Sequence, residues 1–108
     1  MSFITTQNKG FQIKFENGFS ISVQWGTMNY CERKNLMSEH ESEMKESIVE
    51  SVNAEIAIFD GEGEMLEIGK HDTVIGWVFP DEVAKVITIV SSATTKNEIE
   101  TKIKTLNL

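Results

Sequence analysis

The densest group of residues that could do chemistry lies between Trp25 and Cys31. The segment reads Trp-Gly-Thr-Met-Asn-Tyr-Cys, so two aromatic rings, an amide and a thiol fall within seven residues. Aromatic rings often wall ligand pockets, and an amide both donates and accepts hydrogen bonds. The segment suggests a nucleotide-like ligand site formed by Trp25, Asn29 and Tyr30, with Trp77 as a further wall. It equally fits a core tryptophan, a turn glycine and a tyrosine that closes a sheet edge.

Cys31 is the only cysteine, so it forms no intramolecular disulfide and no cysteine-rich zinc site. Arg33 and Lys34 follow it and could lower the pKa of the thiol, while His40 or His71 could serve as a base. No spacing among these residues places them together. The sequence therefore favours a half-buried cysteine without a catalytic role.

Alternating carboxylates at Asp60, Glu62 and Glu64 surround a glycine-bearing turn, as in calcium-binding loops. The motif fails at the twelfth position counted from Asp60, where His71 replaces the bidentate glutamate. Glycine-rich phosphate loops, nucleophile elbows and His-Glu metalloprotease spacings are also missing from the sequence. We therefore expect a protein that is not an enzyme and that uses no metal or other cofactor.

Acidic side chains outnumber basic ones by 17 to 10, which gives a net charge of −7. This charge repels phosphates, so direct binding to nucleic acid or to anionic membranes is disfavoured. If the central segment is helical, four glutamates share one face and could contact a basic groove of another protein. These are Glu39, Glu43, Glu46 and Glu50. A solvated helix face explains the same pattern without a partner.

The chain of 108 residues has the length of one domain, and its 40% apolar and 25% charged residues are typical of soluble globular proteins. Its N-terminal residues show no basic region followed by a long apolar run, and no stretch approaches the ~18 apolar residues of a membrane-spanning helix. Together with the single cysteine, these features favour a cytoplasmic protein.

Alternating apolar residues at 11–15 and 19–25 predict the hairpin that positions the Trp25 segment. A two-residue loop would place its two apolar rows on opposite faces. A three-residue loop at 16–18, with Gly18 left-handed, keeps both rows on one face. The predicted opposite pairs are Phe15 with Phe19, Ile13 with Ile21, and Phe11 with Val23.

Alternation resumes at 54–58 and, after a turn at 61–63, at 66–68, which predicts a second hairpin. A further strand is predicted at 73–79, where Gly76 indicates a bulge or a close neighbour. The expected fold is α+β, with an antiparallel sheet of about five strands built mainly from two hairpins.

Pro80 is followed by acidic residues and apolar residues at helical spacing, which predict a helix packed on one face of this sheet. A strand at 86–90 is the main competitor, because that stretch is β-branched. A capping box of Thr95 with Glu98 predicts a C-terminal amphipathic helix. The whole chain, 1–108, is expected to form a single domain. Its acidic excursion, 32–52, is expected to be a flexible loop or a loosely held helix.

Four segments, 15–26, 29–31, 54–57 and 72–77, carry a resemblance to small bacteriophage and prophage proteins. They read Phe-Glu-Asn-Gly-Phe-Ser-Ile-Ser-Val-Gln-Trp-Gly, Asn-Tyr-Cys, Ala-Glu-Ile-Ala and Asp-Thr-Val-Ile-Gly-Trp. The resemblance covers the chain apart from residues 32–52 and the C-terminal tail, and it brings no known activity or catalytic residues. It implies a short accessory protein made in an infected bacterial cytoplasm, where many such products bind host proteins or signalling nucleotides.

The first functional hypothesis is therefore a non-enzymatic, phage-type accessory protein that binds and inhibits a host protein through the acidic stripe. The alternative is a protein that binds a nucleotide-like ligand at the Trp25 to Tyr30 loop. A homodimer also stays open, since the sheet edge and residues 95–108 both offer partner surfaces.

Overall fold

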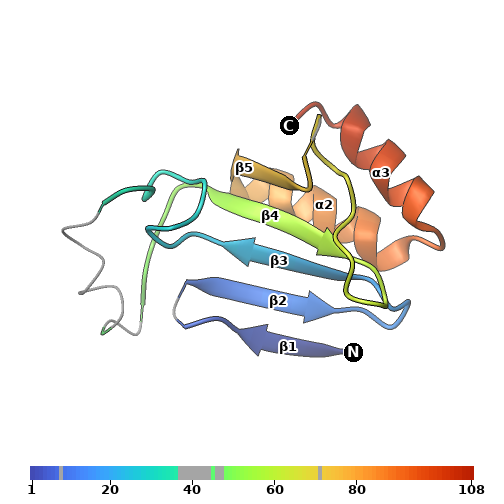
Figure 1. The fold of residues 1–108 in the computed structure, drawn as a ribbon, viewed down its shortest axis with the longest axis horizontal. Coiled ribbons are helices and arrows are strands. Elements are labelled where there is room, and N and C mark those ends of the chain that lie inside the picture. The colour runs from blue at the N-terminus through green and yellow to red at the C-terminus, as the bar shows by residue number, and fades with distance from the viewer. Residues whose placement is uncertain (8, 37–44, 46–47, 71) are drawn as a thin grey trace.

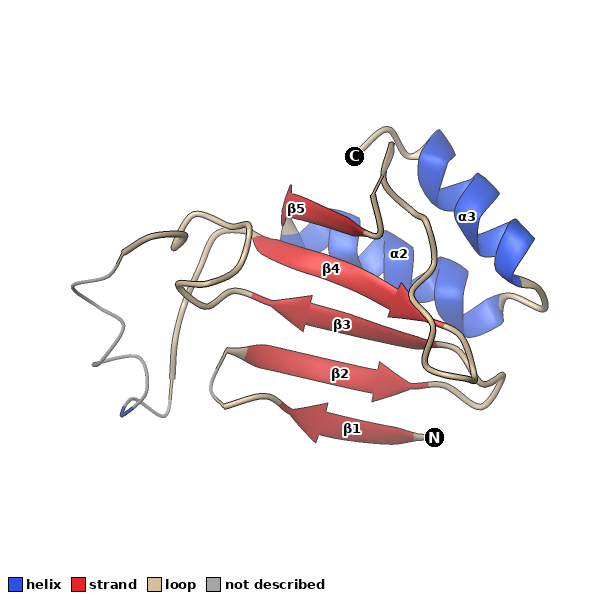
Figure 2. Cartoon of the chain, in the orientation of Figure 1, coloured by secondary structure: helices blue, strands red, loops and turns tan. Residues whose placement is uncertain are grey.

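A computed structural model gives the fold and describes residues 1–7, 9–36, 45, 48–70 and 72–108. The described strands form one antiparallel sheet in which spatial order follows chain order, and helices α2 and α3 come after it (Figure 1). The strands are β1 (Ser2–Thr5), β2 (Gly10–Lys14), β3 (Ser20–Gln24), β4 (Ala54–Phe59) and β5 (Val74–Val78). The helices are α2 (Pro80–Ser92) and α3 (Lys96–Thr105). The predicted α+β architecture is thus confirmed (Figure 2).

The hairpin of β2 and β3 has the predicted register. Ile13 pairs with Ile21 and Phe11 pairs with Val23, and the Phe15 N–H donates to the Phe19 carbonyl at 2.9 Å. Gly18 has φ +93°, which supplies the left-handed residue that the three-residue loop requires. The apolar rows of both strands therefore lie on one face.

Asn17 joins this hairpin to the end of α2. Its Nδ2 donates to the carbonyl oxygens of Val90 and Ala93 at 2.8 and 2.9 Å, while its Oδ1 accepts from the Phe19 N–H at 3.1 Å. The last carbonyls of a helix have no partner within the helix, so a side-chain donor from elsewhere satisfies them. The turn residue thus also caps a helix 73 positions away in sequence.

The core forms between α2 and the β3–β5 part of the sheet, and α3 packs beside α2 (Figure 1). Val83, Val86 and Val90 of α2 are buried against Ile21 and the other central strand residues. Helix α3 adds two further fully buried isoleucines, Ile99 and Ile103. Residues 86–90 are therefore helical, and the competing strand does not form.

Both helix starts follow the predicted chemistry. Pro80 is the first residue of α2, and the Glu82 carboxylate accepts from the Phe79 N–H at 3.0 Å. At α3 the Thr95 hydroxyl accepts from the Glu98 N–H at 3.2 Å, while the Glu98 carboxylate accepts from Thr94 rather than from Thr95. Hydrogen bonds from Lys102 and Thr94 lower the pKa of Glu98.

The second hairpin was predicted too long. Its turn closes with Asp60 opposite Glu64, joined by an N–H···O=C bond of 2.9 Å, but Phe59 and Met65 then form only an isolated bridge. Beyond the bridge the chain leaves the sheet, because Leu66 and the nearby Ile68 are drawn into the core beside α3. The fifth strand is instead β1, which the alternation pattern did not predict.

The expected bulge and the expected close neighbour both occur at Gly76. The pairing of β4 with β5 shifts register between Ala54 and Ile56, and a Cβ built on Gly76 would lie 2.5 Å from the Tyr30 Cβ. Trp77 follows with φ +52°, a rare conformation for a residue other than glycine. The loop after β3 thus packs directly on the edge strand β5.

The predicted acidic excursion at 32–52 is described in part, since residues 37–44 and 46–47 lie outside the described residues. Of its described parts, Lys45 is helical, and Ile48 to Ser51 have no regular secondary structure.

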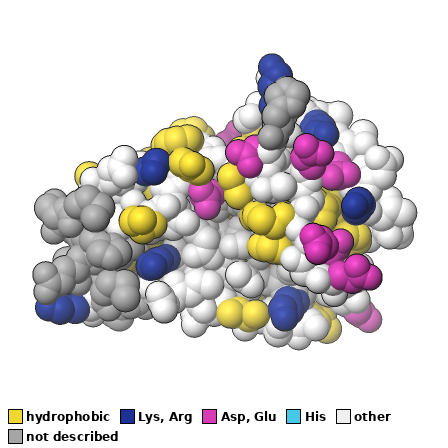
Figure 3. Space-filling model, in the orientation of Figure 1, with side chains coloured by type: hydrophobic (Ala, Val, Ile, Leu, Met, Phe, Trp, Pro, Cys, Tyr) yellow, Lys and Arg dark blue, Asp and Glu magenta, His cyan; other side chains and the backbone are white. Residues whose placement is uncertain are grey.

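On the sheet face turned toward the viewer, which α2 does not cover, hydrophobic side chains form separated patches (Figure 3). Within the described ranges, no helix is both long and apolar enough to cross a bilayer.

Candidate functional site

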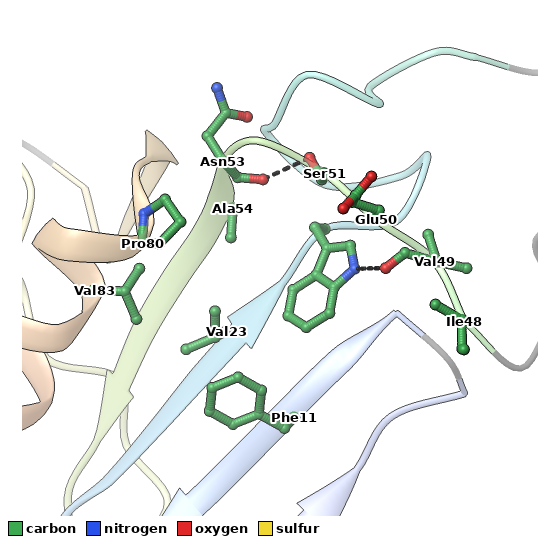
Figure 4. A pocket seen from close by; sticks show the side chains of 11 residues that line it. Phe11, Val23, Ile48, Val49, Glu50, Ser51, Asn53, Ala54, Pro80 and Val83 are labelled. Atoms are coloured by element: carbon green, nitrogen blue, oxygen red, sulfur yellow. Dashed lines mark hydrogen bonds between the residues drawn. The ribbon is translucent and has the colours of Figure 1, made fainter.

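An open apolar pocket of about 420 Å³ lies where β2, β3 and β4 meet the start of α2 (Figure 4). Segment 48–53 forms its remaining wall as the chain returns to β4. The lining residues are Phe11, Val23, Trp25, Ile48, Val49, Glu50, Ser51, Asn53, Ala54, Pro80 and Val83. Most contribute hydrocarbon surface, so the pocket suits an apolar group.

Trp25 is the central side chain of this pocket and is held from two sides. Its ring meets Phe11 edge to face, with centroids 6.2 Å apart and an interplanar angle of 69°. Its Nε1–H donates to the Val49 carbonyl at 2.6 Å, as the dashed line in Figure 4 shows. The one polar atom of the indole is thus already bonded, and the ring presents hydrocarbon to the pocket.

The wall formed by segment 48–53 gives the pocket its acidic and exposed rim. Ile48 is 83% exposed although it lines the pocket, and Glu50 is exposed beside it. Ser51 donates its hydroxyl proton to the Asn53 carbonyl at 2.7 Å, so this polar group is used within the wall. The free features of the rim are therefore an aliphatic side chain and a carboxylate.

Asn29 does not join Trp25 in this pocket, because its amide closes its own loop. Its Oδ1 accepts from the Gly26 N–H at 2.9 Å, and its Nδ2 donates to the Glu55 carboxylate at 3.3 Å. The same carboxylate accepts from the Tyr30 N–H at 3.1 Å. Asn29 and Glu55 thus fix the loop against β4.

Tyr30 and Trp77 form a second aromatic pair. Their ring centroids lie 5.7 Å apart at 37°, both rings are about half exposed, and the Trp77 N–H donates to the Tyr30 carbonyl at 2.9 Å. The Lys34 ammonium lies 4.9 Å from the centroid of the Tyr30 ring, within the range of a cation–π contact. This pair shields the bulged end of β5.

The four predicted ligand residues therefore belong to two different places. Side chains alternate between faces along a strand, and Ala54 and Ile56 both point into the core beneath α2. Glu55 between them consequently points to the opposite face, where it holds Asn29 and Tyr30. Trp25 lines the pocket on the helix side, so the structure does not gather Trp25 and Tyr30 around one ligand.

Cys31 is fully buried, rather than half-buried, and its Sγ lies 3.5 Å from the Gly26 carbonyl oxygen. Burial raises the pKa of this thiol above its ordinary value, and hydrogen bonds and the charge of Arg33 oppose the rise only in part. The thiol is thus held protonated inside the loop.

Of the four glutamates in the predicted acidic stripe, the structure describes Glu50. Glu39, Glu43 and Glu46 lie outside the described residues, and Glu50 is on the rim of the pocket.

The Asp60 carboxylate forms hydrogen bonds within its own turn. Its Oδ1 accepts from the N–H groups of Glu62 and Glu64 at 2.9 and 3.0 Å. His40 and His71 are not among the described residues. No group of three or more His, Cys, Asp or Glu that could hold a metal occurs in the described part of the chain.

The sequence singled out Trp25 but not the residues that surround it in space. The apolar patterns that contain Phe11 and Val83 predict core positions and not a pocket. Val49 lies in a polar stretch without periodicity. One signal was present: Pro80 begins a helix directly after a strand, and pockets often form beside such junctions.

No protein-family model, curated protein or solved structure matches this chain.

Proposed function

We propose that this chain is a non-enzymatic interaction protein that inserts an apolar side chain of a partner into the Trp25 pocket. The observation that carries the proposal is the pocket itself, an open apolar hollow around a fixed tryptophan with Ile48 exposed on its rim. Binding hot spots concentrate in such places, where a buried aromatic side chain is surrounded by groups that exclude water.

The charge of the rim indicates the chemistry of the partner. Glu50 is the charged side chain of the described lining, and Asp81 and Glu82 follow Pro80 in the first turn of α2. An apolar anchor flanked by lysine or arginine complements this surface better than one flanked by carboxylates. In the accessory role that the phage resemblance implies, the partner is a host protein, and binding would inhibit it by covering the surface that carries this anchor.

The alternative, a nucleotide-like ligand, has less geometric support. The described pocket lining offers Glu50 and no lysine or arginine, so a phosphate would meet repulsion there. The Asn29 amide is committed to Gly26 and Glu55, so it has few hydrogen bonds left for a base. If the protein binds a nucleotide, the better candidate surface is the exposed Tyr30–Trp77 pair, which has Lys34 beside it.

Capture from bacterial lysate with matched variants tests the proposal. Ile48→Lys places a charge on the pocket rim at an exposed site, while Val52→Lys makes the same change four residues away, at a site 57% exposed and outside the lining. Both variants should fold, since neither side chain is buried. Wild type and Val52→Lys should retain the same host protein, and Ile48→Lys should lose it. Equal capture by both variants would remove the pocket from the contact surface.

A fluorescence titration separates the two hypotheses. The chain has two tryptophans, so Trp77→Phe leaves Trp25 as the sole reporter. A peptide from the captured protein that carries the apolar anchor should change Trp25 emission, whereas a panel of nucleotides should not. The same nucleotides are titrated into wild type, and a saturable response there that Trp77→Phe abolishes would favour ligand binding at the Tyr30–Trp77 pair instead.

A further inference from the structure

Strand β1 is an edge of the sheet, with no strand on its outer side among the described residues. Its hydrogen-bonding groups alternate in direction along the strand. The Thr6 N–H donates to the carbonyl oxygen of Gly10, the first residue of β2, at 3.2 Å. The backbone N–H of Thr6 therefore points toward β2. Because N–H and C=O groups reverse direction at each residue of a strand, Ser2 and Ile4 also face β2. Phe3 and Thr5 therefore point their N–H and C=O groups outward, away from the sheet.

The opposite edge of the sheet is covered at its bulged end. Trp77 of β5 donates its N–H to the Tyr30 carbonyl, and the bulge at Gly76 is covered by the loop that carries Tyr30. Edge strands are commonly protected by such bulges and covering loops, or by charges and prolines. Within the described residues β1 has no bulge, covering loop, charge or proline, and its short length of four residues is its one protection.

The side chains of β1 make this edge suitable for pairing. The strand reads Ser-Phe-Ile-Thr, with no charge and no proline, and Phe3 is 84% exposed. Phe3 lies opposite Ile13, so its ring projects on the helix side of the sheet, and β1 lies beyond the strands that α2 covers (Figure 1). An exposed aromatic residue on an unpaired edge is a ready cross-strand partner.

We propose that β1 pairs antiparallel with β1 of a second copy of this chain, with Phe3 opposite Phe3 across a two-fold axis. In this register the outward N–H and C=O groups of the two Phe3 residues bond to each other. An axis perpendicular to the sheet keeps the helices of both copies on the same side, so both Phe3 rings project to one face and form an aromatic pair. The sheet then continues through both copies.

A second copy matches β1 in two ways. The outward N–H and C=O groups of Phe3 meet the same groups of the other Phe3, and the two Phe3 side chains lie on the same face of the sheet. The charged side chains near this edge are all positive, but none lies on β1 itself. Residues 1–15 carry Lys9 and Lys14 and no carboxylate. Lys14 is on β2, so its two copies are separated by three strand spacings, about 14 Å. That exceeds the screening length of about 8 Å at physiological salt.

Sedimentation velocity measures the association. Pairing of four-residue strands buries less than the ~1,200 Å² of a standard interface, so a weak dimer that grows with concentration is expected. Phe3→Lys should keep the chain monomeric over the same range. Met28→Lys, a matched change at an exposed apolar side chain in another part of the chain, should dimerise like wild type. A monomer at millimolar concentration, or a dimer unaffected by Phe3→Lys, would overturn the proposal.

Disulfide trapping tests the register. In a Cys31→Ala background, Phe3→Cys should form a covalent dimer on mild oxidation, since directly opposite residues have Cα atoms about 5.5 Å apart. Ile4→Cys is the control, because Ile4 projects to the other face and lies opposite Ser2 in this register. Trapping at Ile4 without trapping at Phe3 would exclude the proposed pairing, as would the absence of trapping at both sites.

Discussion

Asn17 connects the first hairpin to the end of α2, and its removal tests that connection. Asn17→Ala deletes two partly buried hydrogen bonds, to the carbonyls of Val90 and Ala93. Each is worth about 0.5–1.5 kcal/mol net, so the free energy of unfolding should fall by about 1–3 kcal/mol. Urea denaturation at 25 °C measures this loss, which is a large share of the stability of a domain of this size.

Asn17→Asp sharpens the test because it keeps the shape of the side chain. The new carboxylate would face two carbonyl oxygens at the negative end of the α2 dipole, where the last turn carries no basic residue. At pH 7 Asn17→Asp should therefore be less stable than Asn17→Ala, and the difference should shrink at pH 3, where the carboxyl is protonated. A loss below about 0.5 kcal/mol for Asn17→Ala, or an Asp variant as stable as wild type, would refute the capping role.

Three further predictions concern the loop after β3 and the pocket wall. Gly76→Ala would force a Cβ to 2.5 Å from the Tyr30 Cβ, so it should cost about 1–3 kcal/mol in urea denaturation, whereas Gly61→Ala, whose nearest contact would be 3.7 Å away, should cost less. Burial raises the pKa of Cys31, so the unfolded thiol ionises first and the unfolding free energy should fall as pH rises above the ordinary thiol pKa. Cys31→Ala should remove that part of the pH dependence, and an unchanged slope would contradict it. Trp25→Phe loses the bond to the Val49 carbonyl, so amide hydrogen exchange in segment 48–53 should quicken while exchange in α3 stays the same.

Local chemistry made much of this fold predictable. The register of the first hairpin follows from two apolar rows that must share a face, and Gly18 is the residue that the required loop needs. The bulge at Gly76 and the start of α2 at Pro80 likewise depend on what glycine and proline allow. These features are determined within a few residues of sequence.

What the sequence could not predict depends on tertiary packing. Leu66 and Ile68 alternate as in a strand, yet burial beside α3 takes them out of the sheet. Strand β1 is exposed along its length and has no apolar alternation to reveal it. The candidate ligand residues Trp25 and Tyr30 are close in sequence but occupy different faces, because the loop between them is fastened to Glu55.

The central claim is that the Trp25 pocket receives the partner, and site-specific photo-crosslinking in the bacterial cytoplasm tests it most directly. A photoreactive amino acid at Ile48, on the pocket rim, should yield one discrete adduct with a host protein, and excess wild-type chain should compete it away. The same group at Met28, which is 66% exposed and outside this pocket, should not form that adduct. An adduct formed equally from both positions, or from Met28 alone, would contradict the assignment of the pocket as the binding site.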